Sequence, residues 1–261
     1  MNSSRNIKLI IQFDGTDYSG WLYQSGRKTL QGTVMQSIYM LTGNEVEVIG
    51  CSRTDKGVHA VGYVLNFIDN SNIPIEKYPI ALNSFLPEDI CVKSACEVPM
   101  DFHATYLTSK KTYRYYFYTA PSKVPMLNNR AWYIGNSCNY SCENLNTLNK
   151  NLSALCGKHD FSAFRAMGGM SKTTVRTIYD IYVACDDYYS TKMYCLEITG
   201  NGFLYNMVRI IAGTIADIMR GRIQVDSIDK ILKSCDRNKA GQTAPAGGLY
   251  LWKVDYSSSQ H

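Results

Sequence analysis

Apolar and polar residues are patterned along most of the chain, and the patterns predict its first elements. Every second residue from 7 to 13 is apolar, which is typical of a half-buried strand. Apolar residues then recur at helical spacing between Thr29, a good N-cap, and Gly43, a good C-cap, so a helix is predicted there. The same patterns predict strands over 45–49, 61–67 and 90–95, and a helix over 74–85.

The rest of the chain repeats this mixture of strands and helices. A tyrosine-rich run over 112–118 predicts a strand, and four leucines on one face predict a helix over 141–155. Further strands are expected over 175–184, 192–200 and 249–254, and helices over 204–219 and 225–234. The first half has the order of a split βαβ unit. The sequence therefore predicts an α+β protein of two halves, 1–105 and 106–261.

Composition and length exclude several classes of protein. With 45% hydrophobic and 19% charged residues in 261, the chain is neither fibrous nor disordered. Its most apolar stretch, 204–219, contains polar residues and is too short to span a membrane, and residues 1–8 lack the pattern of a signal peptide. Nine irregularly spaced cysteines favour buried, reduced thiols over disulfide staples or a metal site. We expect a cytoplasmic protein without a metal.

Charge is distributed unevenly along the chain. Residues 1–105 carry 8 Lys and Arg against 11 Asp and Glu, whereas residues 106–261 carry 19 against 11. Together with 20 tyrosines, this basic surplus is compatible with a polyanionic partner such as RNA. An ordinary solvated surface gives the same imbalance, so charge alone leaves both interpretations open.

Three segments carry candidate chemistry. The loop over 50–60 brings Arg53, Asp55 and Lys56 together between two strands, although Asp and Gly there also suit a plain turn. The run over 110–118 interleaves basic and aromatic residues, as in a base-stacking sheet or a core strand rich in tyrosine. The helix after residue 203 carries Arg209 among apolar neighbours, where it either needs a carboxylate partner or extends to the surface.

Taken in order, these segments resemble the tRNA pseudouridine synthase A family. The resemblance is carried by FDGTDYSGW, LQG, SRTDKGVHA, FHA, KTYRYYFY, FSAFR, NGFLYNMVRIIAG and GLYL, which begin at residues 13, 30, 52, 102, 111, 161, 201 and 248. It implies two ferredoxin-like halves whose antiparallel sheets meet at a central catalytic cleft, and a homodimer that holds tRNA. It also implies an isomerase that needs no cofactor and converts uridine to pseudouridine at positions 38, 39 or 40 of the anticodon arm.

The resemblance assigns roles to four residues. Asp55 matches the attacking aspartate, a role that suits a carboxylate because it is anionic at neutral pH. Arg53 matches the residue that helps to extrude the target nucleotide. Tyr113 matches the tyrosine that stacks on the uracil and can assist removal of the C5 proton. Arg209 matches the basic residue that pairs with the aspartate, lowering its pKa and fixing its direction.

Substrate-binding residues follow from the same matches. The expected pocket walls are Phe203, Leu204, Met207, Val208 and Leu249. The expected phosphate contacts are Lys110, Lys111, Arg114, Arg165, Lys172 and Arg176. Lys56 and Cys51 depart from the small residues common in the family, which affects substrate preference more than activity. Two alternatives remain: the same reaction at another RNA site, and an RNA-binding protein without catalysis.

Overall fold

The computed structural model describes residues 4–136, 138, 140–141, 145–169, 171–188 and 191–257, and the chain divides into two units. One unit comprises Met1–Ser109 and Tyr250–His261, and the other comprises Lys110–Leu249. The sequence-based division at residue 105 left the last strand in the second half. That strand instead joins the first unit, because its residues Tyr250 and Leu251 pair with the strand that follows the Asp55 loop.

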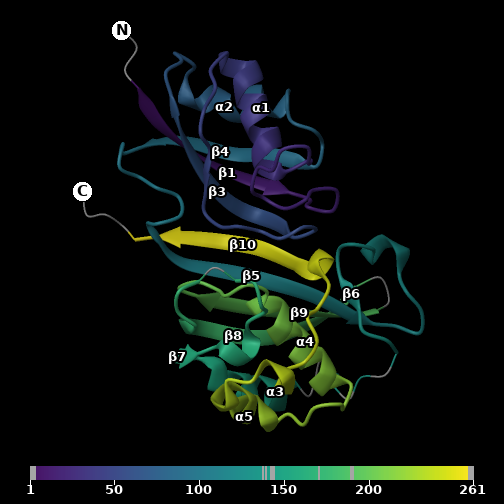
Figure 1. The fold of residues 1–261 in the computed structure, drawn as a ribbon. Coiled ribbons are helices and arrows are strands. Elements are labelled where there is room, and N and C mark those ends of the chain that lie inside the picture. The colour runs from purple at the N-terminus through teal and green to yellow at the C-terminus, as the bar shows by residue number, and fades with distance from the viewer. Residues whose placement is uncertain are drawn as a thin grey trace. The chain divides into compact units, whose positions relative to one another are not determined.

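The first unit is a sheet with two helices, which Figure 1 shows on the same side of it. Its strands are ordered β4-β1-β3-β10; β1 is antiparallel to β3 and β4, and β10 runs parallel to β3. The short β2 also pairs with β3. In chain order the elements are β1 (Arg5–Phe13), α1 (Leu30–Thr42), β2 (Ile49–Gly50), β3 (His59–Asp69), α2 (Tyr78–Asn83), β4 (Ile90–Val98) and β10 (Leu249–Tyr256).

Helix α1 begins and ends where its caps predict. The Thr29 hydroxyl accepts a hydrogen bond from the Gly32 N–H at 3.3 Å, and Gly43 has a φ of 73°. The strand predicted over 45–49 is wrong except for Ile49, since the carbonyl of Val48 accepts from the Gln31 side chain at 2.8 Å. The alternating pattern over 45–49 therefore identified residues that face the core, but most of this segment has no neighbouring strand to pair with and is not a strand.

The second unit contains three helices and a sheet. The strands of this sheet are ordered β5-β9-β8-β7, and neighbouring strands are antiparallel. The two-residue β6 pairs in parallel with β5. Its elements are β5 (Thr108–Thr119), β6 (Trp132–Tyr133), α3 (Leu145–Leu152), β7 (Gly157–Asp160), β8 (Val175–Tyr188), β9 (Thr191–Gly200), α4 (Met207–Met219) and α5 (Ser227–Ser234). The predicted α+β class is confirmed, whereas β6 and β7 were not predicted.

Two helices of the second unit differ from their predicted bounds. The helix predicted over 141–155 is present as α3 and a 3₁₀ turn over Ser153–Leu155, while residues 142–144 lie outside the described part of the chain. Helix α4 begins at Met207 rather than 204 because Asn206 has a φ of 58°, which interrupts the helical backbone. The predicted helix over 74–85 is likewise divided, into a 3₁₀ turn over Ile75–Lys77 and α2.

The expectation of buried, reduced thiols is only partly correct. Among the described residues seven cysteines are free, of which Cys51 alone is buried. Cys185 is disulfide-bonded, which corrects the expectation for that residue, since spacing along the chain does not report which cysteines meet in space. The described helices include none with the length and apolar character that a membrane crossing needs.

Candidate active site

Asp55 lies in the loop over 51–58, which leaves β2 and enters β3. The N–H of Cys51 donates to the Val64 carbonyl at 2.9 Å, and the N–H of Val58 donates to the Asp55 carbonyl at 3.2 Å. Gly57 completes this turn with a φ of 79°. Asp55 is half-buried, so the loop is both a turn and a rigid mount for a carboxylate.

An earlier segment of the chain clamps this loop through its backbone. The N–H of Trp21 donates to the Thr54 carbonyl at 3.1 Å. A Cβ on Gly20, which has a φ of +99°, would lie only 2.7 Å from that same carbonyl oxygen, and a Cβ on Gly15 would collide with the carbonyl of Val58. The two glycines therefore let the loop be held closely on both sides of its carboxylate.

Buried aromatic rings support the start of the loop. The rings of Trp21 and Tyr63 lie 4.1 Å apart, and both side chains are almost completely buried. The Tyr63 hydroxyl donates to the carbonyl of Ser52 at 2.5 Å. Gly50 leaves room for these rings, since a Cβ there would meet both of them. The loop that carries Asp55 is thus built on a rigid part of the core.

His59 follows the loop and was not predicted to have a role. It is 1% exposed, its Nδ1 lies 3.0 Å from Asp14 Oδ1, and its ring stacks on Tyr250 with centroids 4.7 Å apart. The N–H of Gly15 also donates to Nδ1 at 3.2 Å. Through these contacts His59 connects the end of β1 and the start of β10 to the base of the loop. The only sequence signal for this role is the position of the histidine between the loop and β3.

Tyr113 lies on β5 with 7% of its surface exposed. Its ring meets Phe203 edge-to-face, with centroids 5.1 Å apart and an interplanar angle of 85°. Tyr115 and Phe117, on the same strand face, are completely buried, so for them the core-strand interpretation is correct. Burial also raises the pKa of Tyr115, which keeps its phenol neutral.

Arg209 lies on α4 and is held against its own unit. Its Nε donates to the Ala244 carbonyl at 2.7 Å, and its Nη1 donates to Asn206 Oδ1 at 2.8 Å. The Arg209 carbonyl in turn accepts from the Ala244 N–H at 3.1 Å. The half-buried guanidinium is therefore oriented by fixed acceptors and does not extend freely into solvent.

The expected pocket walls are mostly core residues of the second unit. Phe203 is half-buried, whereas the other four are between 1% and 7% exposed: Leu204, Met207, Val208 and Leu249. Burial to this degree fixes their rotamers, which is what a rigid wall needs. Phe203 alone combines partial exposure with a ring contact to Tyr113.

The expected phosphate-binding cations differ in what surrounds them. Arg114 Nε donates to Glu197 at 2.6 Å; burial alone would lower the pKa of Arg114, but this hydrogen bond raises it. Lys110 is exposed with its Nζ 5.0 Å from the centre of the Tyr179 ring. The remaining four are half-buried Lys111, Arg165 and Arg176, and exposed Lys172. The Arg114 charge is thus already balanced by a carboxylate, which makes Arg114 the weakest phosphate candidate.

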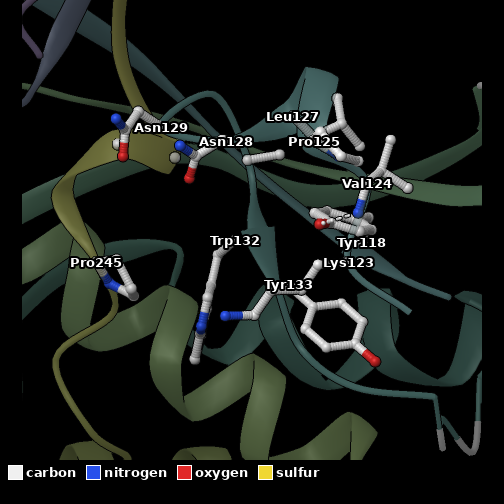
Figure 2. A pocket seen from close by; sticks show the side chains of 13 residues that line it. Tyr118, Lys123, Val124, Pro125, Leu127, Asn128, Asn129, Trp132, Tyr133 and Pro245 are labelled. Carbon is white, nitrogen blue, oxygen red and sulfur yellow. Dashed lines mark hydrogen bonds between the residues drawn. The ribbon is translucent and has the colours of Figure 1, made fainter. Parts of the chain in front are cut away.

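A cavity of about 610 Å³ in the second unit was not predicted. Figure 2 shows Trp132 in it, between Pro245 and Lys123 in this view. The guanidinium of Arg220 lies 5.1 Å from the centre of the Trp132 ring.

None of the described residues form a cluster of three or more His, Cys, Asp or Glu that could hold a metal.

Comparison with known proteins identifies the family. The family model described as tRNA pseudouridine synthase matches residues 9–107 and 152–257, and so includes the Asp55 loop, Tyr205 and Arg209. The chain belongs to the tRNA pseudouridine synthase family. Membership makes it an isomerase that converts uridine in tRNA to pseudouridine, as the resemblance predicted.

Curated relatives named tRNA pseudouridine synthase A match almost the whole chain. The protein of Acetivibrio thermocellus is 46% identical over 252 residues, and that of Ruminiclostridium cellulolyticum is 44% identical over 255. A Clostridium tetani protein named tRNA pseudouridine synthase A 2 is 43% identical over 256 residues. Each match covers 97% of this chain and 100% of the relative, so this pseudouridine synthase is similar to them from end to end.

One solved structure is matched only distantly. A chain of a crystal structure titled Cbf5-Nop10-Gar1 complex is matched with a TM-score of 0.31 and 9% identity, over 80% of this chain and 53% of that chain. A likeness at this level supports no structural argument for the pseudouridine synthase described here.

Proposed function

We propose that this pseudouridine synthase modifies uridines 38, 39 or 40 in the anticodon arm of tRNA, with Asp55 as the nucleophile. The observation that carries the proposal is the clamped loop: Asp55 is half-buried between backbone contacts from Trp21 and Gly20 on one side and Gly15 on the other. A nucleophile must be held in one geometry to attack one atom, and this loop supplies that rigidity.

The reaction is an isomerisation with no net gain or loss of atoms. The C1′–N1 bond of uridine breaks, the uracil turns, and a new bond joins C1′ to C5. The C5 proton is lost and N1 gains a proton, so the reaction needs neither an oxidant nor a cofactor. The Asp55 carboxylate attacks the sugar or the base and leaves again when C5 rejoins, which divides one difficult step into two.

The other assigned residues bind and orient the nucleotide. Arg53 is exposed on the same loop as Asp55 and helps to hold the target uridine out of the stem. Tyr113, supported edge-on by Phe203, stacks on the uracil, and its phenol assists removal of the C5 proton. The pairing of Arg209 with Asp55 is a prediction of the family resemblance.

Fold, assembly and location complete the proposal. The family resemblance implies two ferredoxin-like halves whose sheets meet at a catalytic cleft, and the order β1, α1, β2, β3, α2, β4 supports the ferredoxin-like fold for the first unit. The protein acts in the cytoplasm as a homodimer that holds one tRNA across both copies.

A second candidate is the same reaction at a different RNA site. Lys56 in place of a small residue beside Asp55 supports this possibility, since it adds a charge next to the nucleophile.

The experiment that separates the two candidates maps the modified uridines. Several unmodified tRNA transcripts, each with uridine at one of positions 38, 39 and 40, are incubated with the protein, and pseudouridine is located by carbodiimide-dependent stops of reverse transcription. Stops at these positions support the first candidate. Modification confined to other uridines overturns it in favour of the second.

A further inference from the structure

Two arginines of the second unit lie beside one loop without an acidic partner. Neither Arg165 nor Arg176 forms an ion pair with any carboxylate in the part of the chain that the structure describes. Both side chains are half-buried. They donate at 2.5 to 3.4 Å to the backbone carbonyls of Gly169, Ser171, Thr173 and Val175. Both guanidinium groups are thus held against the same loop by neutral acceptors alone.

Part of each guanidinium stays available for a ligand. Arg165 uses only Nη2 and Arg176 only Nη1, so Nε and the other terminal nitrogen of each lack a hydrogen-bond partner among the described residues. In Arg176 the remaining Nε and Nη2 lie on one edge and form the fork that binds two oxygens of a phosphate, whereas Nε and Nη1 of Arg165 lie on different edges and each donates singly. Burial and the neighbouring Arg165 charge both lower the pKa of Arg176, so the cationic pair is unfavourable until an anion binds.

Glycines keep the donor edges open. A Cβ on Gly169 would lie 3.3 Å from Arg165 Nε, and a Cβ on Gly202 would lie 3.8 Å from Arg176 Nε. Both positions lack a side chain, so the space over each Nε is not filled by the neighbouring residue. This arrangement suits a small oxyanion that approaches the two arginines.

An exposed aromatic ring adjoins the arginine pair. Tyr205 is 44% exposed, and no aromatic ring among the described residues contacts it. Its carbonyl accepts from the N–H of Ala166, and its Cβ lies 3.0 Å from a Cβ built on Gly169, so it stands next to Arg165. Two residues earlier, Phe203 contacts Tyr113.

We propose that Arg165, Arg176 and Tyr205 form a subsite for a nucleotide adjacent to the target uridine. The two arginines bind one phosphate, and the Tyr205 ring stacks on the neighbouring base, which every base permits through its π-face. The subsite rests on the proposed function, in which Tyr113, supported by Phe203, holds the target uracil. The competing explanation is that the arginines only fasten Gly169 and the loop over 171–175.

The arginines are tested by the salt dependence of tRNA binding. Arg165→Gln, Arg176→Gln and the double variant are compared with Lys230→Gln, which removes an exposed charge on α5. Each single variant should weaken binding of unmodified tRNA by about tenfold. The slope of log Kd against log salt should fall by about 0.7 to 0.9 in the double variant, which loses the shared phosphate, and by less in each single variant, which keeps one arginine on it.

Two outcomes overturn the shared phosphate. An unchanged slope together with a lower melting temperature would show that the arginines only fasten the loop. A slope loss of about 1.4 to 1.8 in the double variant, which is that of two contacts, would show two separate phosphates. The Lys230→Gln control should leave both the slope and the melting temperature unchanged.

Tyr205 is tested by separating its ring from its hydroxyl. Tyr205→Phe should bind tRNA as the wild type does, whereas Tyr205→Ala should bind about tenfold more weakly. Tyr39→Ala, a control of similar exposure on α1, should bind normally. Equal affinities for all three variants contradict the stacking role.

The failure of this inference is distinguishable from failure of the proposed function. Turnover of the wild type and of Asp55→Ala is measured with the same protein preparations. If Asp55→Ala keeps its activity, the proposed function is wrong. If Asp55→Ala is inactive and the arginine and Tyr205 variants bind tRNA normally, only the subsite is wrong.

Discussion

At the scale of single residues, backbone groups position much of the site. Arg209 is oriented by the Ala244 carbonyl, and Arg165 and Arg176 by carbonyls of Gly169 and the loop over 171–175. Tyr113 is set by a ring contact with Phe203. Carbonyl groups move less than long charged side chains, so a charge held in this way keeps its direction before substrate binds.

Tyr113→Phe separates the ring of this residue from its phenol. The variant keeps the edge-to-face contact with Phe203 and loses the hydroxyl that is proposed to assist removal of the C5 proton. We expect the single-turnover rate to fall by about 100-fold, in the range of general acid–base catalysis, with tRNA affinity unchanged. A rate equal to that of the wild type would show that only the ring acts.

Asp69 is the residue whose ionisation should matter most for stability of the first unit. Its buried carboxylate accepts from Tyr78 at 2.5 Å, Ser71 at 2.8 Å and Arg5 at 3.0 Å. Burial opposes the charge, yet these hydrogen bonds lower the pKa of Asp69 below its ordinary value. Because the folded-state pKa is depressed, its contribution is present above about pH 4 and is lost as the pH falls through the folded-state pKa.

Asp69→Asn tests this pH dependence. At pH 7 the variant should lose about 2 to 3 kcal/mol of unfolding free energy, and the difference from the wild type should shrink below about pH 4. Urea unfolding between pH 3 and pH 7 measures both effects. Glu97→Gln, which alters the exposed partner of Arg5, should cost less than about 1 kcal/mol. A difference that stays constant with pH contradicts the account.

At the scale of elements, the sequence predicts those that depend on local patterns. The caps at Thr29 and Gly43 fixed α1, and the alternation over 7–13 fixed the core of β1. Elements that depend on distant partners were not predictable. The strand β6 is only two residues long, and the segment over 45–49 has no strand neighbour along most of its length. The start of α4 moved because one residue, Asn206, has a positive φ.

The candidate site follows the same division. The motif around Asp55 predicts the residue and its loop, because the turn is local. The carbonyl of Ala244 that orients Arg209, and the loop that Arg165 and Arg176 share, are brought into place by tertiary folding. No spacing along the chain reports such contacts, and Tyr205 was missed for the same reason.

Gly20→Ala tests the clamp on the Asp55 loop. A Cβ there would lie 2.7 Å from the Thr54 carbonyl, so the loop must move, and a displacement of about 1 Å can reduce catalysis by about 100-fold. Gly26→Ala is a matched control, since Gly26 also has a positive φ but meets no atom within 4 Å. We expect turnover of unmodified tRNA to fall far more for Gly20→Ala. Equal turnover by the two variants would show that the clamp does not position Asp55.

At the scale of the whole molecule, basic charge and assembly concern how tRNA is held. The surplus of 19 basic over 11 acidic residues lies in residues 106–261, and the proposed homodimer would present it twice. Sedimentation equilibrium should give twice the chain mass of 29.4 kDa. A mass equal to one chain at micromolar concentration contradicts the homodimer without affecting the reaction.

The central claim is that Asp55 is the nucleophile of a tRNA uridine isomerase. The most direct measurement is tritium release from tRNA transcripts that carry 5-tritiated uridine, with the wild type and Asp55→Ala compared at equal tRNA occupancy. We expect release by the wild type, none by Asp55→Ala, and nearly equal affinity of the two proteins for tRNA. Release by Asp55→Ala at the wild-type rate would contradict this claim.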